Sequence, residues 1–398
     1  MFTRVVGVVF TLMDTEGSVY GLDHQARCLK AQLGEGERSR FFVGTQDFKH
    51  PNELHLIDYD EDESLITTHK IPHEFEIRSI APHPAQSESV ITVFKEPSKA
   101  PKATLWRLAS PESDATGKLR NDTGTMEAVV HIDPSDQLAA VDDILWDPSS
   151  SKHNRVLARG KHALALFALD EAKTSATATT VIPVKGIDST SRRVACASWN
   201  PHADLIATGV GAAVLGIDLR TPTRSAYEIP AAHTSVRCID YNPIKPQTIA
   251  TGGTDGFIRF WDTRSLVHPI KEVSDHTHWV WTVSFNRIYD QLFLSAGSDC
   301  RVNLQSIISI SSAAALSDIT SSSDNEEAYS ADKTSSRDEF SGNSKPTDGL
   351  VCTSDRHEDS VYAAEWSAAD PWIYASASYD GRVAVNLVPR DHKYKIIL

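Results

Sequence analysis

The chain has 398 residues, of which 40% are hydrophobic, so it is long and apolar enough to bury a large core. Its 53 acidic residues outnumber its 39 basic residues and give a formal net charge of −14. This balance disfavours nucleic acid and anionic membranes as partners held by charge alone, and it leaves protein partners as the better expectation.

The first residues contain a short apolar run, VVGVVFTL (Val5 to Leu12), which follows Arg4 and resembles a short signal peptide. The next residues, Met13-Asp14-Thr15-Glu16, contain no small-x-small cleavage site, so we expect an edge strand or an N-terminal extension instead of a secreted chain. We assign residues 1–18 to this extension, with Met13 as an alternative start. No run approaches the roughly 18 apolar residues that a membrane helix needs, so no membrane insertion is expected.

A repeat begins at three valines, Val236, Val280 and Val361. Each is followed by an aromatic residue at +5, by Thr or Ser at +15 and by Asp at +19. These residues are Tyr241, Phe285 and Trp366, then Thr251, Ser295 and Ser376, then Asp255, Asp299 and Asp380. Three identical spacings in unrelated loops are very improbable, so the chain contains internal repeats.

Fainter copies of the repeat lie upstream and bring the total to seven. Three of them begin at Val194, Val141 and Ile77. One further unit, the first in the chain, combines Phe41 to Thr45 with Leu54 to Asp58. Val194 and Val236 are 42 residues apart, which is the period of a four-stranded propeller blade. Short β-branched and aromatic segments separated by Asp-Gly turns are typical of strands. The sequence therefore predicts an all-β fold, a seven-bladed WD-repeat β-propeller over residues 19–398.

Blade five contains the residues of a WD-repeat structural tetrad: His233, Thr251, Asp255 and Trp261. In such a tetrad Asp accepts a hydrogen bond from His, and His and Thr link on to the indole N–H, so a buried polar set is satisfied internally. The same residue types also suggest a Thr/His/Asp catalytic arrangement, but a network that locks the blade is the preferred interpretation.

Blades six and seven keep only part of this tetrad. They retain His276, Ser295 and Asp299, and His357, Ser376 and Asp380, but Gln305 and Asn386 stand where blade five has tryptophan. We expect these two locks to be weaker, because the indole N–H is missing.

An insertion separates blades six and seven. Val280 and Val361 are 81 residues apart, and the excess lies in residues 311–354. From Ser311 to Leu350 there are eight acidic and three basic residues, with many serines, so we predict a disordered, acidic, Ser-rich insertion before the last blade. Ser323 to Glu326 has the form of an acidophilic kinase site; the alternative is a solvated insertion without a switch.

A partner-binding surface is predicted on the face that carries the tetrad loops. In DHTHWVWTV (Asp275 to Val283), Trp279 and Trp281 flank the reference valine, and one of them is expected to pack inside. Tyr379 precedes Asp380 on the same face by the alignment. The hypothesis is that five residues bind a partner there, since aromatic loop residues are typical interface anchors: His276, Trp279, Asp359, Ser360 and Tyr379.

Motifs for catalysis and for metal or cofactor binding are lacking. Five widely spaced cysteines without C-x-x-C indicate neither a zinc site nor a disulfide framework, which fits a reducing cytosol. There is no Gly-rich phosphate loop, no G-x-S-x-G and no H-E-x-x-H. The sequence thus predicts a protein that is not an enzyme and that needs no cofactor or metal.

Several stretches resemble one known family, the EARP- and GARP-complex-interacting proteins. They are YGLDHQAR (from Tyr20), RFFVGTQ (from Arg40), FIRFWDTR (from Phe257), HTHWVW (from His276), HEDSVYAAEWSAADPW (from His357), SYDGRV (from Ser378) and the terminal KYKIIL. The likeness covers about residues 20 to 398, and it departs from the family at residues 1–18 and in blades two to four.

The resemblance implies a non-catalytic propeller that binds the multisubunit EARP and GARP tethering complexes. These act in endosomal recycling and in endosome-to-trans-Golgi retrograde transport, so the resemblance also implies a cytoplasmic protein that is peripheral on endosomes and the trans-Golgi network. An alternative is a substrate receptor of a cullin-based ubiquitin ligase, because Trp261-Asp262-Thr263-Arg264 fits the W-D-x-R motif and Ile217-Asp218-Leu219-Arg220 fits it weakly. The first is preferred, since W-D closes a tetrad strand in any case.

Overall fold

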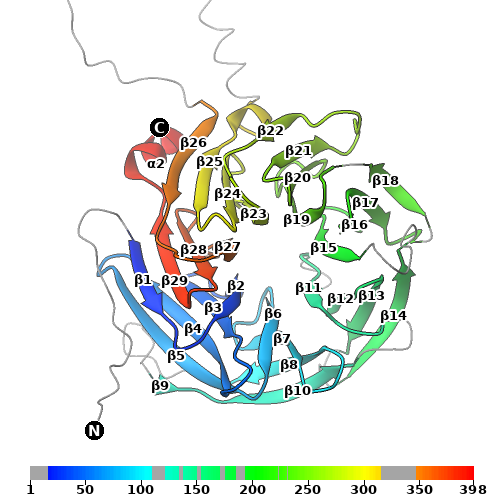
Figure 1. Cartoon of the computed structure of the whole chain (residues 1–398), viewed down its shortest axis with the longest axis vertical. Helices are drawn as coiled ribbons and strands as arrows, with labels where there is room; N and C mark the ends of the chain where they lie inside the picture. Colours follow the sequence, from blue (N-terminus) through cyan, green and yellow to red (C-terminus); the bar gives the residue numbers. More distant parts are fainter. Residues whose placement is uncertain are drawn as a thin grey trace, which may run out of the picture.

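Seven antiparallel sheets surround a central axis in the computed structural model of the chain (Figure 1). The structure describes residues 17–109, 122–133, 138–149, 154–170, 175–184, 193–222, 224–230, 232–314 and 347–398. One strand of each sheet lies near the axis and the others follow outward, as in the blades of a propeller. The seven-bladed β-propeller predicted from the repeats is thereby confirmed.

Blades one to four take up the first part of the ring, and their strands are given from the centre outward. Blade one contains β2 (Ala26–Ala31), β3 (Ser39–Thr45), β4 (Asn52–Asp60) and β5 (Leu65–His73), with the short β9 (Asp122–Thr123) parallel to β5. Blade two contains β6 (Glu76–Pro82), β7 (Ser89–Lys95), β8 (Lys102–Leu108) and β10 (Met126–Ile132). Blade three contains β11 (Asp143–Trp146), β12 (Arg155–Arg159), β13 (Ala163–Leu169) and β14 (Ala176–Pro183). Blade four contains β15 (Val194–Trp199), β16 (Leu205–Val210), β17 (Ala213–Asp218) and β18 (Ser225–Ile229).

Blades five to seven complete the ring. Blade five contains β19 (Val236–Tyr241), β20 (Thr248–Gly253), β21 (Ile258–Asp262) and β22 (Lys271–Val273). Blade six contains β23 (Val280–Phe285), β24 (Leu292–Gly297), β25 (Val302–Ser306) and β26 (Gly349–Ser354), with the 3-10 helix η1 (Ile308–Ile310) after β25. Blade seven contains β27 (Val361–Trp366), β28 (Ile373–Ser378), β29 (Arg382–Leu387) and β1 (Gly17–Gly21), and helix α2 (Arg390–Ile397) follows it.

Strand β1 closes the ring by completing blade seven. It pairs antiparallel with β29, with Gly17 opposite Asn386 and Gly21 opposite Arg382. The propeller thus begins at Gly17, two residues before the predicted boundary, and Ser18 is fully buried. Residues 1–16 lie outside the described residues, and with them the signal-peptide and start-site interpretations.

The core fills the spaces between neighbouring blades. Between blades five and six, the rings of Phe260, Phe285 and Phe293 meet edge to face with centroids 4.9 to 6.0 Å apart. The second strands are buried along their whole length, as the patterns of β20, β24 and β28 show.

The predicted insertion is shorter than the range 311–354. Its last residues, Gly349–Ser354, form β26, with Leu304 opposite Cys352, because Leu350-Val351-Cys352 offers apolar and β-branched side chains to the outer edge of blade six. Residues 315–346, which include the suggested kinase site, lie outside the described residues. In the part of the chain that the structure describes, no helix has the length and apolar character needed to cross a bilayer.

Candidate partner-binding surface

The tetrad of blade five ties the loop before β19 to the turn between β20 and β21. His233 Nδ1 lies 2.8 Å from Asp255 Oδ1, and His233 Nε2 lies 2.9 Å from Thr251 Oγ1. The Trp261 indole donates to the same Thr251 hydroxyl at 3.0 Å. Burial lowers the pKa of His233, although Asp255 opposes the shift, so the imidazole is neutral at neutral pH. Thr251 is fully buried, and its contacts tie β20 to β21 and to the loop that carries His233.

The corresponding sets in blades six and seven are less complete. In blade six, His276 reaches Asp299 at 2.9 Å and Ser295 at 2.9 Å, while the Gln305 amide donates to Asp275 instead of joining this chain. In blade seven, His357 lies 2.8 Å from Ser376, but the Nδ2 of Asn386 is buried and has no hydrogen-bond partner in the part of the chain that the structure describes.

Blade two contains a tetrad-like set that the sequence analysis missed. His73 Nε2 lies 3.1 Å from Thr92 Oγ1, and the Trp106 indole donates to Thr92 at 2.7 Å. His73 Nδ1 turns to the Phe75 carbonyl at 2.8 Å instead of an aspartate. Thr92 stands 15 residues after Ile77, so the +15 spacing of the repeats offered a signal for it.

Four aromatic rings form a row on the face of the tetrad loops. Trp279 is 39% exposed and lies just before β23, with its ring centroid 5.8 Å from that of Trp281. Trp281 lies 5.0 Å from Tyr362 of blade seven, and Tyr362 lies 6.2 Å from Tyr379. The row therefore continues from blade six to blade seven without interruption.

Two arginines extend this row at its ends. The Arg237 guanidinium of blade five lies 5.3 Å from the ring centroids of both Trp279 and Trp281. Arg27 of blade one lies 4.6 Å from Tyr362 and 4.7 Å from Tyr379. Among the described residues neither arginine forms a salt bridge, and the Nε of Arg237 is buried without a hydrogen-bond partner. We call these six residues the aromatic–arginine surface: Arg27, Arg237, Trp279, Trp281, Tyr362 and Tyr379.

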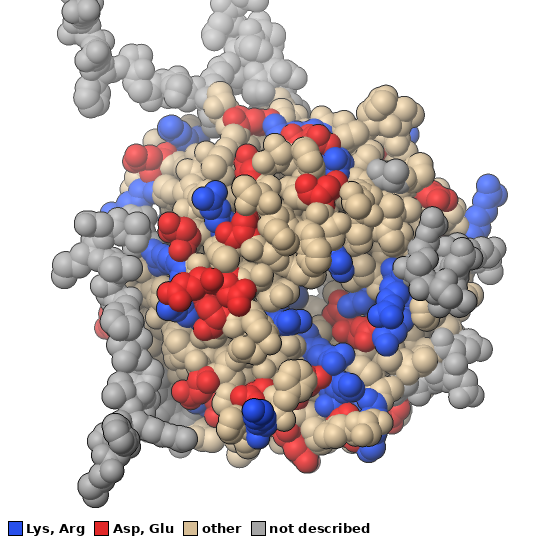
Figure 2. All heavy atoms as spheres, in the orientation of Figure 1, with Lys and Arg blue, Asp and Glu red and all other residues tan. Residues whose placement is uncertain are grey.

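Four members of this surface occupy one equivalent position in their blades. Arg27, Arg237, Trp281 and Tyr362 each follow the first paired residue of the central strand, where a β-bulge leaves one residue unpaired. The bulge turns these side chains toward the same end of the ring. In Figure 2, Lys and Arg side chains and also Asp and Glu side chains lie beside the central opening on the face that is drawn.

Serines hold the loops of the aromatic–arginine surface together. The Trp281 indole donates to Ser298 Oγ at 2.6 Å, and Ser360 Oγ donates to the same atom at 3.1 Å. The Tyr379 N–H donates to the Ser360 carbonyl at 3.1 Å, and the exposed Asp359 adjoins it. Ser360 therefore links blades six and seven and sets the position of Tyr379.

His276 differs from the other residues that were predicted to bind a partner. Its side chain has no exposed surface and is occupied by Asp299 and Ser295. In this structure His276 therefore offers a partner no surface of its own, and its contacts are those of the tetrad position. His276 supports the loop that carries Trp279. The other predicted residues, Trp279, Tyr379, Asp359 and Ser360, are exposed or partly exposed.

The W-D-x-R motif lies at the other end of its strand. Strand β21 runs from the tetrad turn to Asp262, so Arg264 lies on the face opposite the aromatic–arginine surface. Arg264 donates to Asp262 through Nε at 2.9 Å and through a terminal nitrogen at 2.6 Å, and its side chain is 70% exposed. Arg220 and Asp218 of blade four repeat this arrangement.

Comparison with known proteins places this chain in a family. The family model described as EIPR1 beta-propeller matches residues 14–305, and the model of the WD domain, G-beta repeat, matches residues 349–385. The EARP-interacting protein homolog of Gekko japonicus is 36% identical, with 96% of this chain and 98% of the relative covered. The EARP and GARP complex-interacting protein 1 of Homo sapiens is 35% identical over the same shares, and the EARP-interacting protein 1 of Caenorhabditis elegans is 32% identical over 96% and 99%. This chain belongs to the EIPR1 β-propeller family, and the three relatives above are named for interaction with EARP, the human one with GARP as well.

Proposed function

We propose that this chain is a non-catalytic protein-binding scaffold that associates with the EARP and GARP vesicle-tethering complexes. It would act in endosomal recycling and in endosome-to-trans-Golgi retrograde transport, as a cytoplasmic protein peripheral on endosomes and the trans-Golgi network. The names of its relatives support the partner, and the propeller fold supports a role in binding. The observation that carries the proposal is the aromatic–arginine surface, which offers anchors for a protein.

The aromatic rings of this surface have the properties of interface anchors. Trp279 is 39% exposed on a loop, while the serine contacts of Trp281 and Tyr379 fix the geometry around it before a partner arrives. A preorganised aromatic anchor loses little side-chain freedom on binding, and its truncation typically costs about 2 kcal/mol or more of binding free energy. The rings therefore supply apolar contact for the centre of an interface.

The arginines determine which kind of segment fits. Arg27 and Arg237 stack on aromatic rings, and their guanidinium edges have no carboxylate partner among the described residues. A guanidinium with free N–H groups pairs with carboxylates in a bidentate manner. A tether segment that combines apolar residues with Asp or Glu would thus place apolar side chains on the rings and carboxylates beside the arginines at both ends of the row.

Affinity purification with a double variant tests this proposal. Trp279→Ala combined with Tyr379→Ala should keep the thermal unfolding midpoint near that of the wild type. Among the described residues, neither the Trp279 indole nor the Tyr379 hydroxyl makes an internal hydrogen bond that the variant would lose. The variant should recover far less of the tether subunits. Arg264→Ala is the matched control on the opposite face and should recover them fully. A folded double variant that recovers the tether as well as the wild type does would place the binding site elsewhere.

A second candidate function is that of a substrate receptor for a cullin-based ubiquitin ligase. It is favoured by the 70% exposure of the Arg264 side chain, which a ligase adaptor could contact at the W-D-x-R motif. The same purifications distinguish the two functions. Cullin adaptors that are recovered with the wild type and lost with Arg264→Ala would support the second function, and their absence from both samples would count against it.

A further inference from the structure

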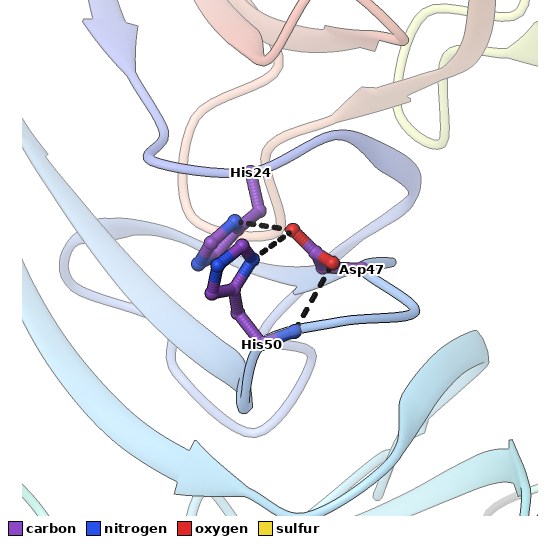
Figure 3. A group of neighbouring side chains, drawn as sticks. All are labelled: His24, Asp47 and His50. Carbon is purple, nitrogen blue, oxygen red and sulfur yellow. Dashed lines mark hydrogen bonds and ion pairs between the residues drawn. The ribbon is translucent and has the colours of Figure 1, made fainter.

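Two histidines and one aspartate converge on the rim of blade one. His24 lies between β1 and β2, and Asp47 and His50 lie between β3 and β4 (Figure 3). Asp47 Oδ2 is 2.9 Å from His24 Nδ1 and 3.0 Å from His50 Nδ1. The two imidazoles are stacked with centroids 5.5 Å apart, and one ligand atom from each of the three residues falls within 4.8 Å of the others.

The position of Asp47 shows how this cluster arises from the repeat. Thr45 pairs with Ala26 in blade one, and Gly253 pairs with Val236 in the same way in blade five. An aspartate lies two residues after each, so Asp47 is the counterpart of the tetrad residue Asp255. By the same register Val43 takes the place of Thr251 and offers no hydroxyl for a histidine to bind. His24 is therefore not drawn into a locking chain, and its side chain is 21% exposed, whereas that of His233 is fully buried.

A longer turn supplies the third side chain. Six residues separate β3 from β4, against four between β20 and β21, and His50 lies within this extension. The turn is fixed by its own hydrogen bonds: Asp47 Oδ1 accepts from the Lys49 N–H at 2.7 Å, and Asn52 Oδ1 accepts from the Asp47 N–H at 2.7 Å. Because Oδ1 is used in this way, Oδ2 faces the two imidazoles.

The donor set suits a borderline divalent cation. Two imidazole nitrogens and a carboxylate oxygen are ligands that Zn²⁺ accepts at about 2.0 to 2.2 Å. Ligands of a tetrahedral ion with such bonds stand about 3.3 Å apart, so the observed 2.9 and 3.0 Å require only a small expansion.

We propose that His24, Asp47 and His50 form a Zn²⁺ site, with the remaining coordination positions open to solvent. The ion lies between the two imidazole Nδ1 atoms and Asp47 Oδ2, which the two imidazoles now contact directly. Sequence reasoning could not find this site, since its ligands come from two loops and have no metal-binding spacing. The site is independent of the proposed partner, because it needs only residues of blade one.

Zinc titration of the purified full chain tests the proposal. After treatment with a chelator, the wild type should bind one Zn²⁺ with micromolar or tighter affinity, measured by competition with a chromophoric zinc indicator. His50→Ala should weaken that binding at least tenfold, and the fold should survive because the His50 side chain is 63% exposed. His268→Ala, which removes an exposed imidazole from another loop, is the matched control and should bind as the wild type does.

Thermal unfolding supplies a second readout that does not depend on the indicator. Zn²⁺ should raise the unfolding midpoint of the wild type and of His268→Ala but not that of His50→Ala, because an ion that binds only the folded state stabilises it. A wild type that takes up no stoichiometric zinc would overturn the proposal. So would a His50→Ala variant that binds zinc as tightly as the wild type does, since the ion would then be held by other residues.

Discussion

His357 Nδ1 lies 3.5 Å from Asp380 Oδ2 and has no hydrogen-bond partner among the described residues, whereas the corresponding Nδ1 of His233 lies 2.8 Å from Asp255. The same two residue types thus form a tight lock in blade five and a loose one in blade seven. The difference accompanies the replacement of the tetrad tryptophan by Asn386, whose amide nitrogen is also left unpaired.

Removing the histidine should therefore cost more stability in blade five than in blade seven. His233→Ala takes one partner from the buried Thr251 hydroxyl and one from Asp255, which keeps Arg259 at 2.6 Å, and such a loss typically costs roughly 1 to 3 kcal/mol of unfolding free energy. His357→Ala should cost less, because one of its two contacts is already poor. Urea unfolding of both variants beside the wild type measures the difference, and equal losses would contradict the comparison.

Asp240 should make stability depend on pH. It is half-buried in β19, its Oδ2 accepts the Phe285 N–H at 2.9 Å, and burial raises its pKa to about 7. Between the ordinary pKa of 3.8 and pH 7, the folded state binds more protons at this group than the unfolded state does. The contribution of Asp240 to stability therefore falls as the pH rises through this window.

Asp240→Asn should remove this dependence. The amide oxygen can still accept the Phe285 N–H, but it carries no charge that must be desolvated. The variant should exceed the wild type in unfolding free energy by more at pH 8 than at pH 5, measured by urea unfolding at both values. Glu228→Gln, which neutralises an exposed carboxylate, is the control and should change neither value appreciably. A gain for Asp240→Asn that is the same at both pH values would show that ionisation is not its cause.

Replacing residues 315–345 by a short Gly-Ser linker should leave the fold intact. The flanks are already held together, since Asp348 accepts the Ser309 N–H at 2.8 Å and pairs with Lys271 at 2.5 Å. Loop-closure entropy changes slowly with length, by about 0.6 kcal/mol for each doubling. The unfolding midpoint should hardly move, whereas the same deletion combined with Asp348→Ala should lower it. Loss of soluble protein on the deletion alone would mean that residues within 315–345 pack on the propeller.

The sequence predicted the locks of blades five to seven because their spacing is constant. It missed that of blade two, although His73, Thr92 and Trp106 have the required types. Thr92 and Trp106 are 14 residues apart, against 10 for Thr251 and Trp261, because the intervening turn is longer. A search for Thr and Trp at a fixed spacing does not find Trp106 after such a turn. The pairing of the strands shows that Thr92 and Trp106 correspond to Thr251 and Trp261.

The binding surface was only partly accessible to sequence reasoning for a different reason. Trp279 and Tyr379 stand out as large aromatics in loops, but Arg27 becomes relevant only when the closed ring brings blade one against Tyr362 and Tyr379 of blade seven. Contacts between residues so far apart in the chain carry no local pattern.

The pairing of β1 with β29 has a consequence for the chain while it is being synthesised. Gly17–Gly21 is synthesised long before its partner Arg382–Leu387. Until then the nascent protein is an open ring with an unpaired strand edge on either side of the gap, and such edges invite pairing with other chains. A nonsense mutation or a ribosomal stall before β29 should therefore yield aggregation-prone material for chaperones and proteases instead of a six-bladed protein with partial activity.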